Sequence, residues 1–236
     1  METRHYRQGE AIDAFAPTGY ERFYWRAVKG SRFLSRIGTR VKLPETVELP
    51  TDRPAIIAAN HSSMFDLVAS LITLGHYGVV ARIGVNSRFF ENPVADWFLR
   101  GIGCIPFSRD HREEAEQTMI DALKAGQVCA IMPEGKIVRP GDQVDGVGQG
   151  RPGVSRIARM AGAAVVPVGF AHSNRAWRPG TPFPKLAQRS AAVVTSLGAP
   201  LWFDTDDHRA NADELMESIS ELVLQGRNSS SVEREV

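Results

Sequence analysis

Cysteine, long apolar runs and net charge are all scarce in this sequence, and each scarcity excludes a class of protein. Only two of the 236 residues are cysteine, Cys104 and Cys129, and they lie far apart in apolar stretches, which argues against a disulfide framework or a zinc cluster. No run of about 18 uncharged apolar residues occurs, so we expect no transmembrane helix. The formal net charge is +1, whereas a general nucleic-acid-binding domain is plainly basic. We therefore expect no nucleic acid among the partners.

What is present suits a folded protein of the cell interior. A hydrophobic fraction of 43% is enough for a core and too high for a disordered chain. The first ten residues, METRHYRQGE, are charged throughout and lack the apolar run of a secretory signal. We therefore expect the protein in a reducing compartment.

A basic and aromatic segment lies between residues 20 and 42. It holds seven Lys or Arg against one acid, a local charge of +6. At the helical spacing of about 100° per residue, most apolar side chains fall on one side and most cations on the other, which predicts an amphipathic helix. This helix either packs on the domain with a solvated basic face or lies on an anionic membrane surface. The predicted membrane-docking residues are Arg22, Phe23, Tyr24, Trp25, Arg26 and Lys29.

From residue 54 onward, apolar runs rich in Val, Ile and Ala alternate with helical stretches. This pattern predicts an α/β fold: a single domain with a largely parallel central sheet covered by helices on both faces, preceded by the amphipathic helix. The expected strands are 55–60, 79–83, 104–107, 128–132, 165–170 and 191–197, and the expected helices after residue 54 are 67–74, 93–99, 111–125 and 213–223.

His61 follows the first of these strands, and Asp66 lies five residues later at the start of a helix. A carboxylate in that position can hold one ring nitrogen of the imidazole and leave the other to take a proton from a hydroxyl, as a general base for acyl transfer does. The alternative is a histidine satisfied in the turn, with Asp66 as a helix cap. A serine hydrolase is not favoured, because no G-x-S-x-G elbow is present.

Arg109 follows the strand 104–107, where a guanidinium would hold a phosphate; the alternative is a surface arginine paired with Asp110.

Pro167 interrupts the strand 165–170 and predicts a sheet edge or a bulge, because proline lacks the backbone N–H.

Glu134 and Gly135 follow the strand 128–132. Gly135 begins a segment with six glycines, residues 135–153, which we predict to be a mobile loop. Ligand sites of open α/β sheets lie beyond the carboxyl ends of strands, so the loop's cations are candidate ligand contacts. They are Lys136, Arg139 and Arg151. The alternative here is a β-turn with a solvated acid.

In this order, the segments resemble the PlsC-like glycerolipid acyltransferase family, which includes 1-acylglycerol-3-phosphate acyltransferase and other lysophospholipid acyltransferases. The family's N-H-x4-D signature is present as Asn60, His61 and Asp66, and its G-x-I-x-F-x-R motif spans residues 103–109. Its Pro-Glu-Gly motif falls within residues 132–137, its basic F-K-x-G is similar to residues 150–153, and its V-V-P-V is residues 165–168. The resemblance covers residues 52–170.

The resemblance implies that His61 activates the hydroxyl of a lysophospholipid and that Asp66 orients it. The hydroxyl would attack the thioester of acyl-CoA or acyl carrier protein, with no acyl-enzyme, no cofactor and no metal. The most favoured reaction converts 1-acylglycerol-3-phosphate into phosphatidic acid, in phospholipid biosynthesis, on the cytoplasmic side of a membrane. The implied acceptor-binding residues are Arg109, Glu134, Gly135, Lys136, Arg139 and Arg151, and Phe107 and Pro167 would place the acyl chain or the acceptor.

One departure from the family pattern leaves the acceptor open. The Thr-Arg that follows Glu-Gly in the family is here Lys136-Ile137. Either Arg139 or Arg151 replaces that arginine, or the acceptor is a different hydroxyl, such as that of a glycolipid or natural product. A non-catalytic membrane-binding protein is a third reading. By this interpretation, residues 1–50 form a membrane-docking segment, 51–226 the acyltransferase catalytic domain, and 227–236 a frayed tail.

Overall fold

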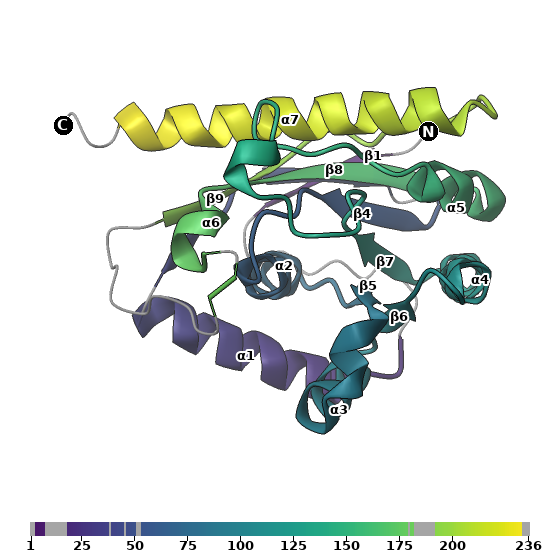
Figure 1. The fold of residues 1–236 in the computed structure, drawn as a ribbon, viewed down its shortest axis with the longest axis horizontal. Helices are drawn as coiled ribbons and strands as arrows, with labels where there is room; N and C mark the ends of the chain where they lie inside the picture. Colours follow the sequence, from purple (N-terminus) through teal and green to yellow (C-terminus); the bar gives the residue numbers. More distant parts are fainter. Residues whose placement is uncertain are drawn as a thin grey trace.

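The computed structural model describes residues 3–7, 18–37, 39–44, 46–50, 53–178, 180–181 and 192–232 (Figure 1). The strands in these ranges are β1 (Thr3–Arg7), β2 (Arg40–Lys42), β3 (Thr46–Pro50), β4 (Ala55–Ala59), β5 (Ala81–Asn86), β6 (Ile105–Phe107), β7 (Val128–Ile131), β8 (Ala164–Ala171) and β9 (Ala192–Leu197). The helices are α1 (Glu21–Ile37), α2 (Phe65–His76), α3 (Pro93–Gly101), α4 (Arg112–Lys124), α5 (Gly153–Ala161), α6 (Ser173–Ala176) and α7 (His208–Val232), with 3-10 turns η1 (Ser87–Glu91) and η2 (Pro140–Asp142).

The main sheet has seven strands in the order β2-β9-β8-β4-β7-β5-β6. Its pairs are parallel except β8 with β9, and β1 pairs with β3 in a separate antiparallel ribbon. The predicted α/β class with a largely parallel sheet is therefore confirmed. Because β4, β7, β5 and β6 run in the same direction, the segments that follow them all begin at one edge of the sheet.

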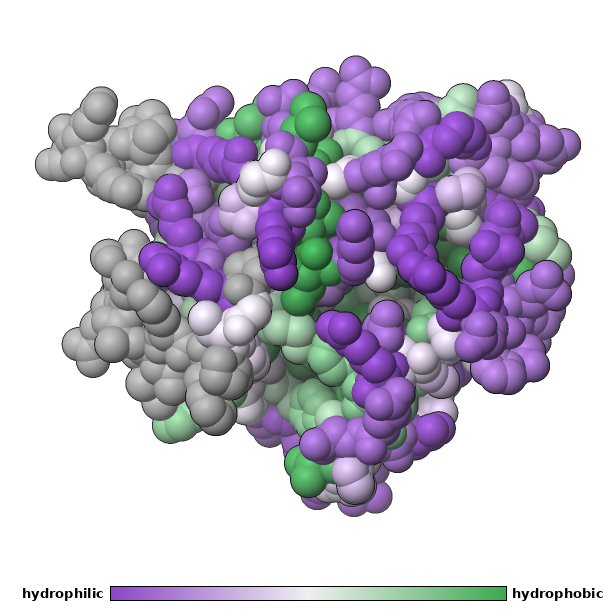
Figure 2. All heavy atoms as spheres, in the orientation of Figure 1, coloured by the Kyte–Doolittle hydropathy of each residue, from purple (hydrophilic) through white to green (hydrophobic). Residues whose placement is uncertain are grey.

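Helices cover both faces of the sheet, which explains the continuous apolar runs of its strands. Ile56 and Ala58 of β4 pack in one hydrophobic cluster with α4, α5 and α7, and Ile57 and Ala59 pack in another with α1 and α2. Figure 1 shows α7 along one face and α1 and α2 along the other. On the surface seen in the same orientation, hydrophilic side chains surround a central hollow walled by hydrophobic residues (Figure 2).

The N-terminal helix α1 is part of this packing. Its Tyr24 and Val28 are fully or almost fully buried, and α1 comes so close to α2 that a Cβ atom on Gly75 would lie 2.6 Å from Cγ1 of Val28. The prediction that Tyr24 docks on a membrane is therefore wrong, because Tyr24 belongs to the core-facing side of the helix. Trp25 is half-buried against the same cluster.

The predicted boundary at residue 50 does not coincide with a structural boundary. Strand β2 pairs with β9 in the main sheet, and Val47 and Leu49 of β3 are buried in the cluster between the sheet and α2. Residues on both sides of position 50 therefore share one core.

Helix α7 extends beyond the end predicted for it and includes the first six residues of the predicted tail, 227–232. Gly226, taken as its end, lies within the helix, where a Cβ atom would be 3.0 Å from Cβ of Ala171. The glycine therefore serves close helix–sheet packing and does not end the helix. Residues 233–236 lie outside the described residues.

Pro167 does not mark a sheet edge, because β8 is paired on both sides, with β4 and β9. The bulge alternative fits instead. Val165 bridges Leu201 and Val168 pairs with Leu197, so residues 198–200 leave the ladder opposite Pro167. The carbonyl of Pro167 accepts a hydrogen bond from the backbone N–H of Gly198 at 3.0 Å. The proline nitrogen, which has no N–H to donate, faces the same side of β8, where the pairing with β9 is interrupted.

Candidate active site

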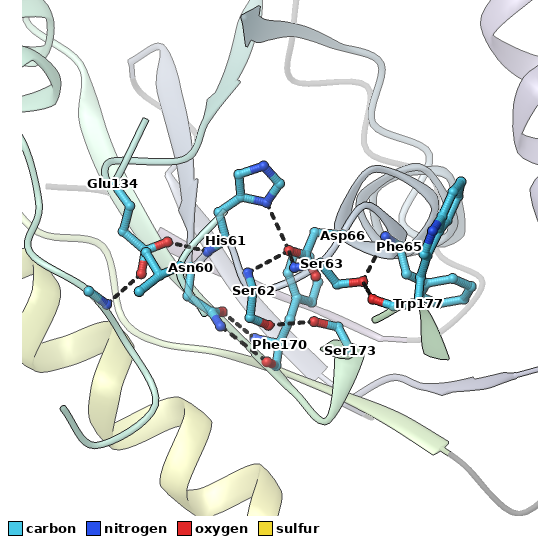
Figure 3. Close-up of polar contacts among 12 residues, drawn as sticks. Asn60, His61, Ser62, Ser63, Phe65, Asp66, Glu134, Phe170, Ser173 and Trp177 are labelled. Atoms are coloured by element: carbon cyan, nitrogen blue, oxygen red, sulfur yellow. Dashed lines mark hydrogen bonds and ion pairs between the residues drawn. The ribbon is translucent and has the colours of Figure 1, made fainter. Parts of the chain in front are cut away.

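His61 and Asp66 form a hydrogen-bonded pair between the end of β4 and the first turn of α2 (Figure 3). The imidazole Nδ1 lies 2.9 Å from Asp66 Oδ2, and the backbone N–H groups of Ser62 and Ser63 each donate to the same oxygen at 2.8 Å. These donors precede Asp66 in the chain, so the carboxylate does not act as the predicted helix cap. The hydroxyl of Ser63 accepts from the N–H of Phe65 instead, at 3.0 Å.

This arrangement determines which ring nitrogen of His61 carries the proton. Asp66 is fully buried and accepts two amide protons on Oδ2, which identifies that oxygen as an acceptor. Nδ1 of His61 is therefore the donor, so in the neutral imidazole Nε2 is the nitrogen without a proton. Figure 3 shows that Nε2 is directed away from Asp66, and the His61 side chain is 20% exposed. The imidazole can therefore accept a proton from a bound molecule.

The backbone of His61 is held by the segment that follows β7. The carboxylate of Glu134 accepts hydrogen bonds from the N–H of His61 through Oε2 and from the N–H of Gly148 through Oε1. The N–H of Val138 donates to the carbonyl of His61 at 2.8 Å. The main chain of the histidine is thereby fixed on both its N–H and its C=O.

The N–H of Gly135 donates to the carbonyl of Met132 at 3.0 Å, so the β-turn of the alternative is present, but Glu134 is 2% exposed and is not a solvated acid. Burial raises the pKa of its carboxyl to about 7, although the N–H groups of Gly148 and His61 act in the opposite direction. Because each carboxylate oxygen already accepts a backbone N–H, we revise its expected role from acceptor binding to support of the histidine.

The glycine-rich segment 135–153, predicted to be mobile, is hydrogen-bonded to the strand ends. Besides the Val138 and Gly148 contacts, the N–H of Arg151 donates to the carbonyl of Pro133 at 2.9 Å. Gly135 has a φ of +65° and lies beside the guanidinium of Arg151, where a Cβ atom would be 2.9 Å from Nε. Arg151 therefore lies next to the Glu-Gly turn. The alternative in which Arg151 replaces the missing family arginine requires this position.

Lys136, Arg139 and Arg109 are exposed at the same edge of the sheet. Arg109 follows β6, which is separated from β4 by β5 and β7. With neighbouring strands about 4.8 Å apart, the two strand ends lie roughly 14 Å from each other. Arg109 thus occupies the active-site edge at a distance from His61. In the described part of the chain, no ion pair joins it to Asp110.

Phe107 and Pro167 point away from the cavity described next. Phe107 packs with the cluster under α4, where Gly84 leaves room for its ring, and Pro167 lies near Gly198 and Leu222 of α7. Side chains alternate between the two faces of a strand, and both residues face the α4, α5 and α7 side. Their positions therefore give no support to a role in placing the acyl chain, and a role in placing the acceptor stays a prediction.

An apolar cavity lies between the sheet and α2. It reaches from Ala59, Met132 and Phe170, near the carboxyl ends of β4, β7 and β8, to Tyr77 and Val128 at the opposite edge. Its remaining lining is Leu49, Ile57, Ser70, Thr73, Leu74, Val79, Ile83, Ala130, Ile131, Val168 and Leu197. Sequence reasoning missed these residues, because in the sequence they have the same apolar pattern as the core.

The His61–Asp66 pair lies beyond the carboxyl end of a central strand of a largely parallel α/β sheet, which is where ligand sites of such sheets occur. A family model described as acyltransferase matches residues 40–171, more than half of the chain. The protein therefore belongs to the acyltransferase family.

Within the described ranges, no three His, Cys, Asp or Glu side chains form a group that would hold a metal ion.

Among solved structures, the chain is similar to the crystal structure of PlsC, the 1-acyl-sn-glycerophosphate (LPA) acyltransferase from Thermotoga maritima. The TM-score is 0.66 at 20% sequence identity, and the match covers 87% of this chain and 80% of that chain. This likeness confirms the fold. No curated protein matches the sequence.

Proposed function

We propose that this protein transfers a fatty acyl group from a thioester to the hydroxyl of 1-acylglycerol-3-phosphate, giving phosphatidic acid. Membership of the acyltransferase family and the PlsC-like fold support glycerolipid acyltransferase activity. The observation that carries the proposal is the His61–Asp66 pair, whose geometry leaves Nε2 free to accept a proton.

In the proposed reaction, Nε2 of His61 takes the proton of the acceptor hydroxyl while that oxygen bonds to the thioester carbonyl carbon. Asp66 stabilises the imidazolium that forms. The tetrahedral intermediate then collapses, the carbon–sulfur bond breaks, and the thiolate of coenzyme A or acyl carrier protein takes the proton from the imidazolium. His61 returns to its starting state, and no acyl-enzyme is formed.

Two neighbouring features support the choice of substrates. The guanidinium of Arg151 beside Gly135, with the exposed Lys136 and Arg139 on the same loop, supports an acceptor that carries a phosphate. The apolar cavity under α2 includes residues near the carboxyl edge in its lining, which supports a substrate with a hydrocarbon part; with a volume of about 30 Å³, it has to widen to admit a fatty acyl chain.

The test is release of free thiol by purified protein given lysophosphatidic acid with acyl-CoA, and separately with acyl carrier protein charged with the same acyl group. We expect release with at least one donor. No release with either donor across a panel of lysophospholipids would overturn the proposal. Release only with a glycolipid or a neutral hydroxyl acceptor would keep the chemistry and replace the acceptor, as Lys136-Ile137 allows.

We also propose that the protein binds peripherally to the cytoplasmic side of an anionic membrane through α1. The face of α1 opposite Tyr24 carries exposed cations and an exposed Phe33, 63% accessible. Phe23 forms an edge-to-face contact with Trp97 of α3, with ring centroids 5.0 Å apart, and Trp97 is itself 65% exposed. The cations are Arg22, Arg26, Lys29 and Arg36.

No helix in the described ranges has the length and hydrophobicity to cross a bilayer.

A further inference from the structure

Three side chains around His61 tie its turn to the end of β8 and to the segment that follows it (Figure 3). Asn60 reproduces a peptide pairing with Phe170: its Nδ2 donates to the carbonyl at 3.2 Å, and its Oδ1 accepts from the N–H at 2.7 Å. The hydroxyls of Ser62 and Ser173 are 2.7 Å apart, and the hydroxyl of Ser63 donates to the carbonyl of Trp177 at 2.7 Å. These bonds join residues 60–63 to residues 170–177 on both sides of the histidine.

The Ser62–Ser173 contact is enclosed by protein. Ser62 is 5% exposed and Ser173 is fully buried, so neither hydroxyl can exchange its partner freely for bulk water. Ser173 also follows His172, which has a φ of +66°, a left-handed conformation that side-chain-bearing residues adopt rarely. The hydrogen bond between the hydroxyls of Ser173 and Ser62 can stabilise this strained turn at His172. Ser173 lies beyond the residues 40–171 that match the acyltransferase family model.

A chain of contacts leads from Ser173 to the general base. Ser173 holds the side chain of Ser62, and the backbone N–H of Ser62 donates to Asp66 Oδ2. The same oxygen accepts from Nδ1 of His61. The backbone N–H of Ser62 is therefore one of the two amide donors that fix the oxygen to which the imidazole is hydrogen-bonded.

We propose that Ser173, acting through Ser62, is a positioning residue for His61: the hydroxyl pair locks the turn so that Nδ1 of the imidazole stays protonated toward Asp66 and Nε2 stays free. The kinetic consequence rests on the proposed acyltransferase function. The structural consequence, a single His61 tautomer, does not. Ser173 itself touches no reacting atom in this arrangement.

The test compares Ser173→Ala with Ser155→Ala. Ser155 is also fully buried and hydrogen-bonded, to His208 and Asn211, but it lies on α5 across the sheet. The first readout is the nitrogen-15 spectrum of the histidine side chains, with the His61 signals assigned by their loss in His61→Ala. We expect one tautomer in wild type and Ser155→Ala, and a mixture in Ser173→Ala.

The second readout is steady-state kinetics of thiol release. A catalytic geometry that is slightly displaced costs rate more than binding, so we expect kcat of Ser173→Ala to fall about ten- to hundred-fold with KM within about twofold. Ser155→Ala should lose stability and keep its kcat. An unchanged His61 tautomer in Ser173→Ala would overturn the inference whether or not the enzyme is active on the chosen substrates. An unchanged kcat in an active enzyme would also overturn it.

The double variant Ser62→Ala/Ser173→Ala separates positioning from stability. Removing both hydroxyls leaves no buried partner unpaired, so part of the stability lost in Ser173→Ala should return. The tautomer mixture and the low kcat should persist, because the lock is still absent. Recovery of a single tautomer together with stability would show a purely structural role and overturn the inference.

Discussion

His61 is held at three points, its imidazole by Asp66 and its main chain by Glu134 and Val138, so loss of the ring should leave the turn in place. Asp66 Oδ2 keeps two amide donors when the imidazole is removed. His61→Ala should therefore lower kcat at least about 100-fold while the unfolding temperature changes little. Thiol release and thermal unfolding measure the two effects, and full turnover by the variant would refute the general-base role.

We expect Glu134 to make the stability of the protein depend on pH. Burial raises its pKa from 4.5 to about 7, so the folded state binds this proton more tightly than the unfolded state does. The resulting stabilisation is complete below about pH 4.5 and disappears as the pH rises to about 7. We expect the free energy of unfolding of wild type relative to Glu134→Gln to fall by on the order of 3 kcal/mol across this range.

Chemical denaturation at several pH values measures this difference. Two stability curves that stay parallel from pH 4.5 to 7 would contradict the assignment of the titration to Glu134.

Arg151 should discriminate between acceptors. Because its guanidinium lies beside Gly135 at the active-site edge, Arg151→Ala should raise KM for lysophosphatidic acid about tenfold and leave KM for a neutral acceptor unchanged. Lys124→Ala is the matched control, since Lys124 is an exposed cation at the end of α4, before β7 begins. Equal effects of the two variants on KM would remove Arg151 from the acceptor site.

At the scale of elements, glycines decide how closely helices approach the sheet. A Cβ atom on Gly169 of β8 would lie 2.7 Å from backbone atoms of Leu222 and Val223 in α7, and backbone cannot rotate away as a side chain can. Gly169→Ala should therefore destabilise the fold by about 1–3 kcal/mol.

Gly30 offers the opposite case, because it lies exposed within α1 and nothing is within 4 Å of its added Cβ. Gly30→Ala should stabilise the protein by about 0.5–1 kcal/mol through helix propensity. Denaturant unfolding of both variants checks the pair. A destabilised Gly30→Ala, or a neutral Gly169→Ala, would show that the described packing is wrong.

Helix α1 shows how far an amphipathic pattern predicts a structure. The helix and its basic face follow from the spacing of cations between residues 20 and 42, and the structure places Arg22, Arg26 and Lys29 at the surface. The pattern alone did not distinguish an aromatic residue that meets the core from one that meets lipid. Tyr24 meets the core, while Phe33 is exposed, because α2 and the sheet define which side of α1 is covered.

For the whole molecule, the near-zero net charge conceals one basic surface on α1. Sedimentation with vesicles should show binding to anionic lipid and little binding to neutral lipid, with binding reduced at high salt. The triple variant Arg22→Glu/Arg26→Glu/Lys29→Glu should lose most of this binding and keep its folding temperature, since all three side chains are exposed. Equal binding of wild type to both kinds of vesicle would contradict the electrostatic part of the proposal.

The sequence by itself determined the α/β class and the positions of the main strands, because apolar runs are local patterns, and it offered the pairing of His61 with Asp66 as one of two alternatives at a strand–helix turn. Only the tertiary structure decided that Glu134 supports the histidine, that Arg151 lies beside Gly135, and that Ser173 contacts Ser62. These contacts join residues 16 to 111 positions apart. The order and direction of strands bring such residues together, and no local pattern encodes that order.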